Sequence, residues 1–385
     1  MIVFDVQALQ SAAHGQRGIG RYTLELARAL HAEFPGDVEA FAWNDRLPRT
    51  PELDRLDVGD RLVPFSALAG ERVDVLHVSS PFEMRDLAEV AVPVNARRLV
   101  VTCYDVIPYR FGEAYLADRR AAARYRARLA MLASADAVVT DSQSAADDLA
   151  ELVGIDRRRL HVIGGGVGGE FVPPTDDVAA RMAGLGADLP DLGEGYVLVP
   201  TGMDWRKNAA GAIAAYALLA AELRGRHQLV LACAVEPGYE AWLRLLADET
   251  GVADRLVITG YVTDATLVRL YQTAEVVFFP SYYEGFGLPV LEALRCGARV
   301  ITSSASSLPE LIGDKRALFD PSDTTDMAQL LEAALDDPTV GARAGSDDEA
   351  RFTWPATAHK LVAVYRALSE QMLSHTAGGE GQPAA

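Results

Sequence analysis

At 385 residues the chain is too long for a single hydrophobic core, and half of its residues are hydrophobic, so the sequence predicts two domains with buried sheets. A formal net charge of −18 excludes the broad basic surface with which proteins collect nucleic-acid phosphates. The three cysteines stand singly in apolar segments without C-x-x-C spacing, which favours reduced core residues. The chain opens on a β-prone run in which no secretory signal is recognisable, so we expect a cytoplasmic protein.

The first half of the chain alternates β-prone runs with helical segments. Ile19, Tyr22, Leu26 and Leu30 follow helical spacing, so a helix is expected directly after the glycine-bearing loop at residues 15–20. Strands are expected at residues 2–6, 38–43, 73–78, 98–103, 137–140 and 160–163.

The second half repeats this rhythm. Strands are expected at residues 196–200, 228–233, 255–259, 276–279, 299–302 and 317–319. Helices are expected at residues 208–223, 239–249, 265–273, 288–296, 325–335 and 356–373. Two successive series of strands and helices of similar size predict an α/β fold with two doubly wound domains.

The domain boundaries follow from composition. Residues 1–183 are expected to form the first domain, a loose stretch at 184–195 the linker, and residues 196–354 the second domain. A last helical segment at 355–375 ends the fold, and residues 376–385 are expected to be a disordered tail. Because ligand pockets favour domain interfaces and the carboxyl ends of parallel strands, we expect the active cleft between the domains.

Residues 281–292 carry the most informative motif of the chain. They read Ser-Tyr-Tyr-Glu-Gly-Phe-Gly-Leu-Pro-Val-Leu-Glu and place Glu284 and Glu292 on either side of a turn between a buried strand and a helix. Gly285 and Gly287 let backbone N–H groups approach a ligand, and the helix N-terminus that follows favours an anion. Carboxylates accept hydrogen bonds from hydroxyl groups, so a phosphate and a polyol in one pocket describe a nucleotide sugar. The E-x7-E spacing by itself is also typical of an ordinary strand–turn–helix with two solvated glutamates.

With Gly-Phe-Gly-Leu-Pro between its two glutamates, this segment resembles the donor-site signature of the retaining family-four glycosyltransferases of GT-B fold. The resemblance implies two Rossmann-like domains that face each other across a cleft, the first binding the acceptor and the second the donor. It also implies that the last helix crosses back to the first domain. In such a site Glu292 binds ribose hydroxyls and Glu284 orients the hydroxyls of the sugar. The backbone amides that assist Glu284 belong to Gly285, Phe286, Gly287 and Leu288.

Residues 201–208, Thr-Gly-Met-Asp-Trp-Arg-Lys-Asn, follow the first strand of the second domain and open its first helix. Arg206 and Lys207 can neutralise a departing diphosphate there, each charged hydrogen bond being worth about 1.5–3 kcal/mol. The alternative, a solvated basic pair at a helix start, is disfavoured because the helix dipole repels cations at that end. The segment resembles the R-K-N form of the family's phosphate-binding loop, with Met203 where arginine is commoner.

Two segments of the first half resemble further motifs of this family. Residues 17–22, Arg-Gly-Ile-Gly-Arg-Tyr, resemble its glycine loop, which implies that Gly18 lies close to the phosphates. A tight turn that needs glycine for a positive φ is the other interpretation. Residues 101–108 resemble a segment in which histidine precedes the aspartate, and Tyr104 stands in the histidine position. The resemblance implies that Tyr104 and Asp105 face the acceptor and the donor sugar.

Two glycine-bearing turns have competing interpretations. Residues 260–264 end a strand where relatives hold the nucleotide base through backbone groups, which points to Tyr261 and Val262, whereas a structural turn is the alternative. Residues 163–169 contain a literal G-x-G-x-x-G, but a dinucleotide site requires a helix directly after it. The prolines at 173–174 exclude an early helix, so the sequence predicts no dinucleotide site there.

Five arginines crowd one predicted helix opposite an apolar stripe. We expect a solvated face, and the alternative is contact with anionic lipid at the inner membrane face or with a phosphorylated acceptor. These residues are Arg119, Arg120, Arg124, Arg126 and Arg128.

Metal-binding patterns are absent from the sequence. No D-x-D occurs in the 385 residues and the seven histidines are scattered. The other large glycosyltransferase architecture uses such an acidic pair to hold a metal on the diphosphate. Together with Arg206 and Lys207, this favours charge neutralisation by side chains, with no metal and no other cofactor.

The sequence therefore predicts a metal-independent enzyme that moves a hexose from a nucleotide sugar to a hydroxyl of a saccharide, lipid-linked or natural-product acceptor, with retention. By analogy with relatives that carry the Tyr-Asp-Val-Ile-Pro and Arg-Lys-Asn forms, GDP-mannose is favoured over a UDP-sugar. The alternatives are a sugar-nucleotide epimerase of the same fold and a non-catalytic donor-binding partner subunit. Intact Glu284, Glu292 and Lys207 argue against the partner subunit.

Overall fold

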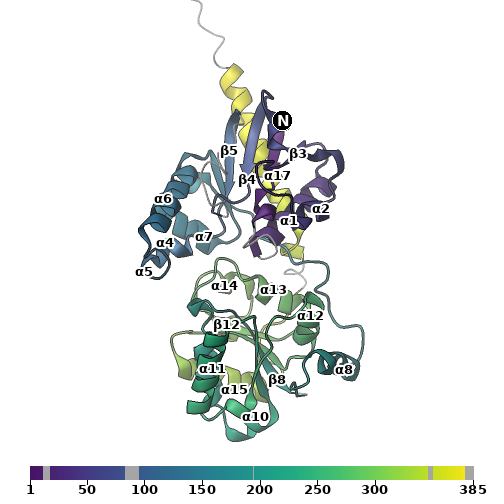
Figure 1. Ribbon diagram of the computed structural model, residues 1–385, viewed down its shortest axis with the longest axis vertical. Helices are drawn as coiled ribbons and strands as arrows, with labels where there is room; N and C mark the ends of the chain where they lie inside the picture. Colours follow the sequence, from purple (N-terminus) through teal and green to yellow (C-terminus); the bar gives the residue numbers. More distant parts are fainter. Residues whose placement is uncertain (12–17, 83–94, 194, 346–349, 378–385) are drawn as a thin grey trace, which may run out of the picture. The chain divides into compact units, whose positions relative to one another are not determined.

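The computed structural model describes residues 1–11, 18–82, 95–193, 195–345 and 350–377 (Figure 1). They form two compact units. The first unit comprises Met1–Gly166 together with the segment from Phe352 onward, and the second unit comprises Val167–Arg351.

The first unit is built on a seven-stranded parallel sheet of order β3-β2-β1-β4-β5-β6-β7. Its central strands are buried almost continuously rather than in alternation, because helices cover both faces of the sheet. Neighbouring side chains of β1 enter different cores, with Val3 in one hydrophobic cluster and Phe4 in the other. The strands are β1 (Ile2–Asp5), β2 (Ala40–Trp43), β3 (Leu62–Pro64), β4 (Val73–Val78), β5 (Ala96–Thr102), β6 (Ala137–Thr140) and β7 (Leu160–Val162).

The helices of the first unit divide between these two clusters. Leu26 and Leu30 of α1 and Leu361 of α17 lie in the cluster of Phe4, whereas Leu129 of α6 lies in the cluster of Val3. The helices are α1 (Gly18–Glu33), α2 (Pro51–Arg55), α4 (Ile107–Arg110), α5 (Gly112–Tyr115), α6 (Arg119–Ser134), α7 (Gln143–Asp148) and α17 (Trp354–Ala377).

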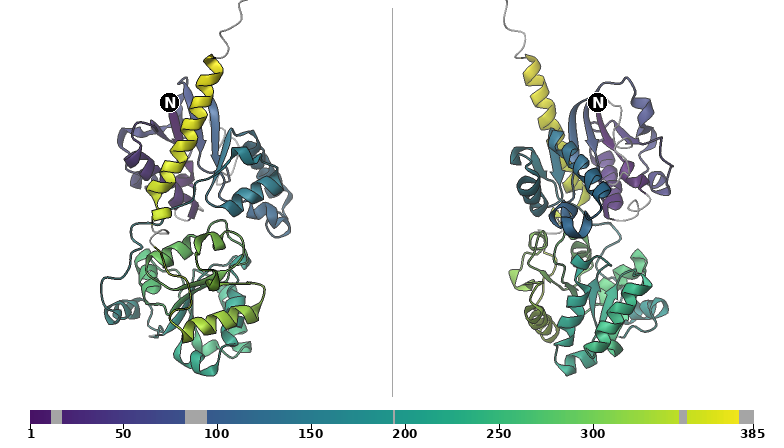
Figure 2. Two further views of the ribbon diagram at one scale, coloured as in Figure 1. Left: turned by 180° about the vertical axis from the view of Figure 1, so that it is seen from behind. Right: turned by 60° about the vertical axis from the view of Figure 1, so that its left-hand side comes forward.

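Helix α17 is the predicted last helix, and it returns to the first unit as expected (Figure 2, yellow). It packs against α1 and β4. The hydroxyl of Tyr365 hydrogen-bonds Nδ1 of the fully buried His77, whose Nε2 lies 2.7 Å from Oγ1 of Thr102. A side chain at Gly166 would place its Cβ 2.4 Å from the backbone nitrogen of Trp354, so glycine is required where the returning segment crosses.

The second unit repeats the architecture with a six-stranded parallel sheet of order β10-β9-β8-β11-β12-β13. Helix α9 packs with α11 and α15, whereas α12 packs with α8 and α13. The strands are β8 (Tyr196–Pro200), β9 (Gln228–Ala232), β10 (Leu256–Ile258), β11 (Val276–Phe279), β12 (Val300–Ser303) and β13 (Leu318–Phe319). The helices are α8 (Val178–Asp188), α9 (Ala209–Ala217), α10 (Ala221–Arg226), α11 (Pro237–Glu249), α12 (Asp264–Thr273), α13 (Leu288–Arg295), α14 (Leu308–Leu311) and α15 (Thr324–Asp336).

The secondary structure differs from the sequence prediction in two places. Strand β3 was not predicted, because a three-residue run that ends in proline carries little strand signal. The single helix predicted at residues 208–223 is broken into α9 and α10. The break keeps Leu219 and Leu223 buried while Leu218 is exposed, so packing ends a helix that local propensity would continue.

The boundary between the units also differs from the prediction. It lies at Gly166–Val167 rather than near residue 183, and the stretch predicted as a linker at 184–195 lies inside the second unit. Helix α8 begins before this stretch, at an N-cap where the Asp177 side chain accepts from Ala180 N, and ends inside it at Asp188. The hydroxyl of Thr266 on α12 donates to Asp188 Oδ2 at 2.8 Å. Residues 184–188 of the predicted linker belong to α8, which docks against α12, and residues 189–193 form no helix.

Membrane spans were sought among the described residues. None of their helices combines the length and the apolar composition that crossing a bilayer requires.

Candidate functional site

The candidate residues of the second unit follow two neighbouring strands. β8 and β11 lie side by side where the strand order of the sheet reverses. The loop at 201–208 follows β8, and the loop at 280–287 follows β11. Doubly wound sheets bind ligands at the carboxyl ends of the strands at this switch point, so the fold brings the two predicted motifs to the expected edge.

Asn208 shapes the first of these loops. It has a φ of 54°, and asparagine is one of the few non-glycine residues that adopt this left-handed conformation readily. Its Oδ1 accepts from Gly211 N and so caps α9, while its Nδ2 donates to the carbonyls of Pro280 and Pro321 at 3.1 and 3.2 Å. The buried amide therefore ties the loop after β8 to the loop after β11. The sequence motif includes this asparagine but does not indicate its role.

Lys207 and Glu284 form the central ion pair of the site. Lys207 Nζ lies 2.6 Å from Glu284 Oε1, and the two side chains are 24% and 10% exposed. The ammonium also lies 5.5 Å from the centre of the Phe279 ring, within cation–π range. Because the pair is only partly exposed, water and salt screen its charges less than they would at an open surface.

Two serines that the sequence did not single out hold the Glu284 loop. Glu284 N donates to Ser306 Oγ at 2.8 Å, and Ser307 Oγ donates to the carbonyls of Glu284 and Phe286 at 3.0 and 2.9 Å. These serines follow β12, the neighbour of β11 in the sheet. A serine-rich run after a buried strand is the signal that could have pointed to them.

The fold requires Gly287 and buries the side chain of Phe286. Gly287 has a φ of 106° and caps α13, and a Cβ there would lie 2.8 Å from Leu308 Cδ2. This glycine is therefore explained by backbone conformation and packing, in addition to the ligand approach predicted from the sequence. The Phe286 side chain is buried, so its backbone is what it can offer to a ligand. Gly285 and Leu288 are half-buried on either side.

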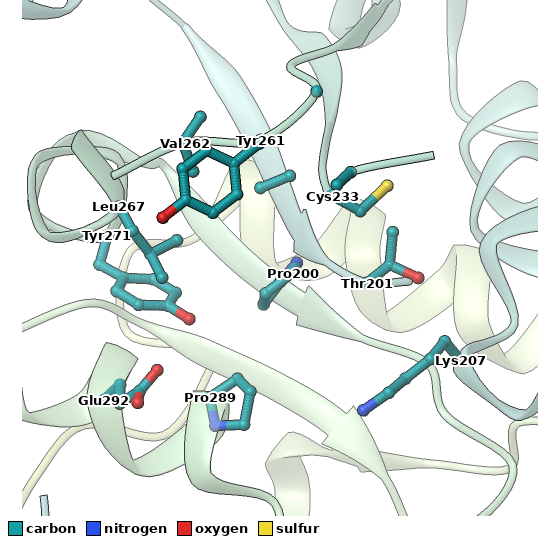
Figure 3. Close-up of a pocket in the computed structure, with 13 residues that line it drawn as sticks. Pro200, Thr201, Lys207, Cys233, Tyr261, Val262, Leu267, Tyr271, Pro289 and Glu292 are labelled. Atoms are coloured by element: carbon teal, nitrogen blue, oxygen red, sulfur yellow. The ribbon is translucent and has the colours of Figure 1, made fainter. Parts of the chain in front are cut away.

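A cavity of about 220 Å³ brings together several predicted donor residues (Figure 3). Lys207, Glu292, Tyr261 and Val262 line it. Figure 3 shows Tyr261 and Lys207 on opposite sides of the cavity. Glu284 does not line this cavity, but it forms an ion pair with Lys207, which does.

Thr201 lines the same cavity and was not predicted as a site residue. Its Oγ1 is buried and has no hydrogen-bond partner among the residues that the structure describes. Thr201 comes directly after β8, so the rule that carboxyl ends of strands carry ligand contacts was the available signal.

Arg206 does not join this cavity. Its Nη1 donates to the Tyr283 carbonyl at 2.8 Å, its Nη2 contacts Asp204 Oδ2 at 2.9 Å, and its side chain is 12% exposed. Its own carbonyl accepts from Tyr282 N at 2.7 Å. Arg206 therefore joins the loops after β8 and β11, while the ammonium of Lys207 is the cation that lines the cavity.

The predicted site residues of the first unit lie next to the expected elements: Tyr104 and Asp105 come after β5, and Gly18 begins α1. Asp105 comes after β5, and its Oδ1 accepts from Ile107 N at 2.9 Å at the start of α4. The ring of Tyr104 packs edge-on against Tyr22 of α1, with the ring centres 4.9 Å apart. Gly18 is the first residue of α1, has no positive φ, and leaves open space for a Cβ among the described residues. The tight-turn interpretation therefore does not explain Gly18, whereas Arg17 of the same motif lies outside the described residues.

Two family models match the chain and together span most of it. The model described as Glycosyltransferase Family 4 matches residues 16–168, and that described as Glycosyl transferases group 1 matches residues 189–351. The chain belongs to the family-four glycosyltransferases of GT-B fold.

The chain is also similar to individual glycosyltransferases. The serotype-specific mannosyltransferase WbdA of Escherichia coli is 36% identical over 319 residues, which are 81% of this chain but only 39% of the relative. The chain thus spans about two fifths of that protein's length. The O-antigen chain mannosyltransferase B of Escherichia coli is 28% identical over 91% of this chain and 96% of its own. Among solved structures, Anabaena HepE in complex with UDP and glucose has a TM-score of 0.71 at 16% identity, over 95% of this chain and 99% of that one. This likeness concerns the fold.

The arginine-rich helix of this family member is α6. Arg119, Arg120, Arg124 and Arg126 are exposed, which agrees with a solvated face. Arg128 is buried on the packed side of the helix, so it does not belong to that face as the sequence had suggested. Nothing in the structure adds support for a membrane contact.

The glycines at 164–169 open no helix, as predicted. The three cysteines are buried and free of disulfides, and burial raises the pKa of Cys296 to about 12. Among the described residues no three histidine, cysteine or acidic side chains gather as a metal site would require, and the absence of a metal from the reaction stays a prediction.

Proposed function

We propose that the chain transfers a hexose from a nucleotide sugar to an acceptor hydroxyl, with retention at the anomeric carbon and without a metal. The observation that carries this proposal is the Lys207–Glu284 pair, 2.6 Å apart, beside the cavity that Glu292 lines. A cation, two carboxylates and a helix N-terminus at the carboxyl edge of a parallel sheet suit a ligand that bears both phosphates and hydroxyls.

The cavity is proposed to hold the nucleoside end of such a donor. Its volume of about 220 Å³ is below the roughly 300–1,000 Å³ of pockets that hold a whole small ligand. Tyr261, Val262 and Leu267 offer apolar surface for a nucleoside base, and Glu292 can accept hydrogen bonds from ribose hydroxyls. The diphosphate then extends toward Lys207 on the opposite side.

Lys207 supplies the charge that the reaction needs. When the bond between C1 of the sugar and the phosphate oxygen breaks, the leaving diphosphate gains negative charge, and Lys207 stabilises it together with the backbone N–H groups at the start of α13. Glu284 orients the ammonium in advance and retains lone pairs for a sugar hydroxyl. Arg206 acts indirectly, by joining the two loops that carry Lys207 and Glu284.

The anomeric configuration is retained if the acceptor attacks C1 from the same face of the sugar that the diphosphate leaves. The acceptor oxygen forms its bond to C1 on the face that the diphosphate leaves, and the freed phosphate oxygen takes the acceptor proton. One bond breaks, one forms and the proton is accounted for, so no carboxylate nucleophile is needed. Tyr104 and Asp105 of the first unit are proposed to contact acceptor and sugar, and Gly18 to allow close approach of the phosphates.

The donor and acceptor are proposed by analogy with relatives. The two Escherichia coli relatives are described as mannosyltransferases, one of them of an O-antigen chain, which favours GDP-mannose and a saccharide acceptor. HepE is described in complex with UDP and glucose, which makes a UDP-sugar the next candidate.

The test begins with a thermal-shift screen of GDP-, UDP- and dTDP-sugars, followed by transfer to a manno-oligosaccharide in EDTA. We expect stabilisation by one nucleotide class, a product longer by one hexose, and the donor's anomeric configuration in the product by NMR. Inverted configuration would contradict retention, and activity that returns only with a divalent cation would contradict metal independence. Donor that is converted in the absence of acceptor would support an epimerase instead.

A further inference from the structure

The second unit exposes an unusual group of aromatic side chains beside the candidate donor cavity. We call it the aromatic rim, and it consists of Met203, Trp205, Tyr239, Trp242 and Tyr282. Trp205 is 46% exposed and Trp242 is 47% exposed, whereas Tyr196 and Tyr216 of the same unit are completely buried. Both tryptophans of the second unit belong to the rim. Large exposed apolar groups that gather in one place mark interaction sites more often than scattered ones do.

The rim consists of two aromatic pairs. The ring centres of Trp205 and Tyr282 lie 6.0 Å apart with their planes at 36°, and those of Tyr239 and Trp242 lie 5.5 Å apart at 27°. Met203 connects the pairs, because its sulfur accepts from the backbone N–H of the residue that caps α11, at 3.2 Å. The two pairs are thus joined through the loop at 201–208.

The rim is held by the same loops as the candidate site. Trp205 directly precedes Arg206, whose carbonyl accepts from Tyr282 N at 2.7 Å. Lys207 and Glu284, two residues beyond Trp205 and Tyr282 respectively, form the ion pair. The segments that carry the rim, helix α11 and the two loops, follow β9, β8 and β11, which are consecutive in the sheet. Trp205 and Tyr282 of the rim therefore stand on the same two loops as the proposed reaction centre.

The charges around the rim decide which class of ligand fits it. Asp204, Glu236 and Glu240 lie on the segments that carry the rim. Asp204 pairs with Arg206 and Glu240 with Arg244, and the chain as a whole has a net charge of −18. The net negative charge of the chain disfavours nucleic acid and anionic lipid, and the paired charges offer no basic patch on these segments. A neutral sugar is accommodated, because the C–H groups on one face of a pyranose pack on the electron-rich face of an aromatic ring. Its hydroxyls can donate to the surrounding carboxylates.

We propose that the aromatic rim is a glycan subsite, which binds sugar units of a neutral saccharide acceptor beyond the unit that receives the hexose. The inference rests on the proposed function for its connection with transfer, but the binding itself can be measured separately. It assigns to the second unit a share of acceptor recognition that the sequence had assigned to Tyr104 and Asp105 of the first unit.

Binding is tested by tryptophan fluorescence of the full chain titrated with a manno-disaccharide and a manno-hexasaccharide. We expect the hexasaccharide to change the emission of the wild type, and this change to be lost in Trp205→Ala and reduced in Trp242→Ala. Leu218→Ala, which removes an exposed apolar side chain at the far end of α9, is the control and should respond like the wild type. Equal thermal stabilisation by nucleotide in all variants verifies that they are folded.

Transfer provides the second measurement. In Trp205→Ala the ratio of kcat/KM for the hexasaccharide to kcat/KM for the disaccharide should fall about tenfold, the effect of losing one aromatic contact, and Trp205→Phe should restore most of it. An unchanged ratio, or an emission that does not respond to the hexasaccharide while transfer proceeds, would overturn the subsite and leave the proposed function standing. An emission change without transfer from any donor would support the rim and contradict the function. A wild-type dimer that Trp205→Ala dissociates would assign the rim to a second copy of the chain and overturn the proposal.

Discussion

Each of the two sheets reverses its strand order at one point, between β1 and β4 in the first unit and between β8 and β11 in the second. At the second point the charged side chains are paired beside a cavity: Lys207 lines it, and Glu284 pairs with Lys207. At the first point Asp5 and His77 are buried. Burial raises the pKa of Asp5, at the end of β1, to about 7 and lowers the pKa of His77 on β4 to about 3.

The same topology thus serves two purposes. In the second unit the charged side chains of Lys207 and Glu292 line a cavity that a ligand could enter. In the first unit the buried polar side chains form hydrogen bonds within the unit. Asp5 accepts a hydrogen bond from Gln7 N at 2.7 Å, and His77 bonds the returning helix through Tyr365. Substitutions at the second switch point should therefore affect turnover most, and those at the first should affect stability and its pH dependence.

The largest effect is expected from the ion pair. Lys207→Ala and Glu284→Ala should each lower turnover by roughly 10²–10³, comparable to the loss of one transition-state donor. Lys315→Ala and Glu249→Ala remove an exposed lysine and an exposed glutamate from the same unit and serve as matched controls. Steady-state kinetics with the donor identified by the thermal-shift screen provides the measurement. Near-normal turnover in both site variants would show that the pair is structural.

Asn208→Ala should destabilise the second unit alone, by about 2–3 kcal/mol. The substitution removes the cap of α9 and the two hydrogen bonds to the carbonyls of Pro280 and Pro321. Alanine also adopts the left-handed φ of this position less readily than asparagine does. Hydrogen exchange followed by mass spectrometry can assign the loss to peptides of each unit, with the exposed Asn95→Ala as control. Equal loss of protection in the first unit would contradict the division into separate stability units.

His77→Gln should alter how stability depends on pH. The pKa of His77 is lowered in the folded state, so its contribution to stability is fully present above about pH 6.5 and is lost as the pH falls through that value toward 3. While His77 titrates only in the unfolded chain, the slope is about 1.4 kcal/mol per pH unit.

The difference between the wild-type and His77→Gln unfolding curves, measured in urea from pH 4 to pH 8, isolates this slope from that of the other groups. We expect the difference to shrink as the pH falls below about 6.5. Curves that stay parallel over the whole range would contradict the assignment of a neutral buried histidine.

The smallest effect is expected from the arginines of α6. Replacing the four exposed ones, Arg119, Arg120, Arg124 and Arg126, by alanine should change the unfolding free energy by no more than about 0.5 kcal/mol for each. Sedimentation with anionic liposomes should be the same for wild type and variant. If the wild type sediments and the variant does not, the face is a lipid contact rather than a solvated surface.

Local patterns were sufficient for most of the fold. The predicted strands and the two motifs of the second unit are where the sequence places them. Buried parallel strands need continuous apolar runs, and the turns after them need glycine, proline or a capping side chain. The same patterns misplaced the domain boundary, because the small residues of α8 become helical through contact with α12. Local patterns also could not assign different roles to the adjacent Arg206 and Lys207. Both side chains are cationic, and only their contacts in the folded protein differ.

By itself the sequence determined the two doubly wound sheets and the candidate acids and cations, and its resemblance to the family implied the return of the last helix. Only the tertiary structure decided that Lys207 rather than Arg206 lines the cavity, that Ser306 and Ser307 hold the Glu284 loop, and that five aromatic and thioether side chains form one rim. The reason is physical. Spacing along the chain specifies periodicity and turns, whereas the partners of a charge or a ring come from strands that are distant in sequence and adjacent in the sheet.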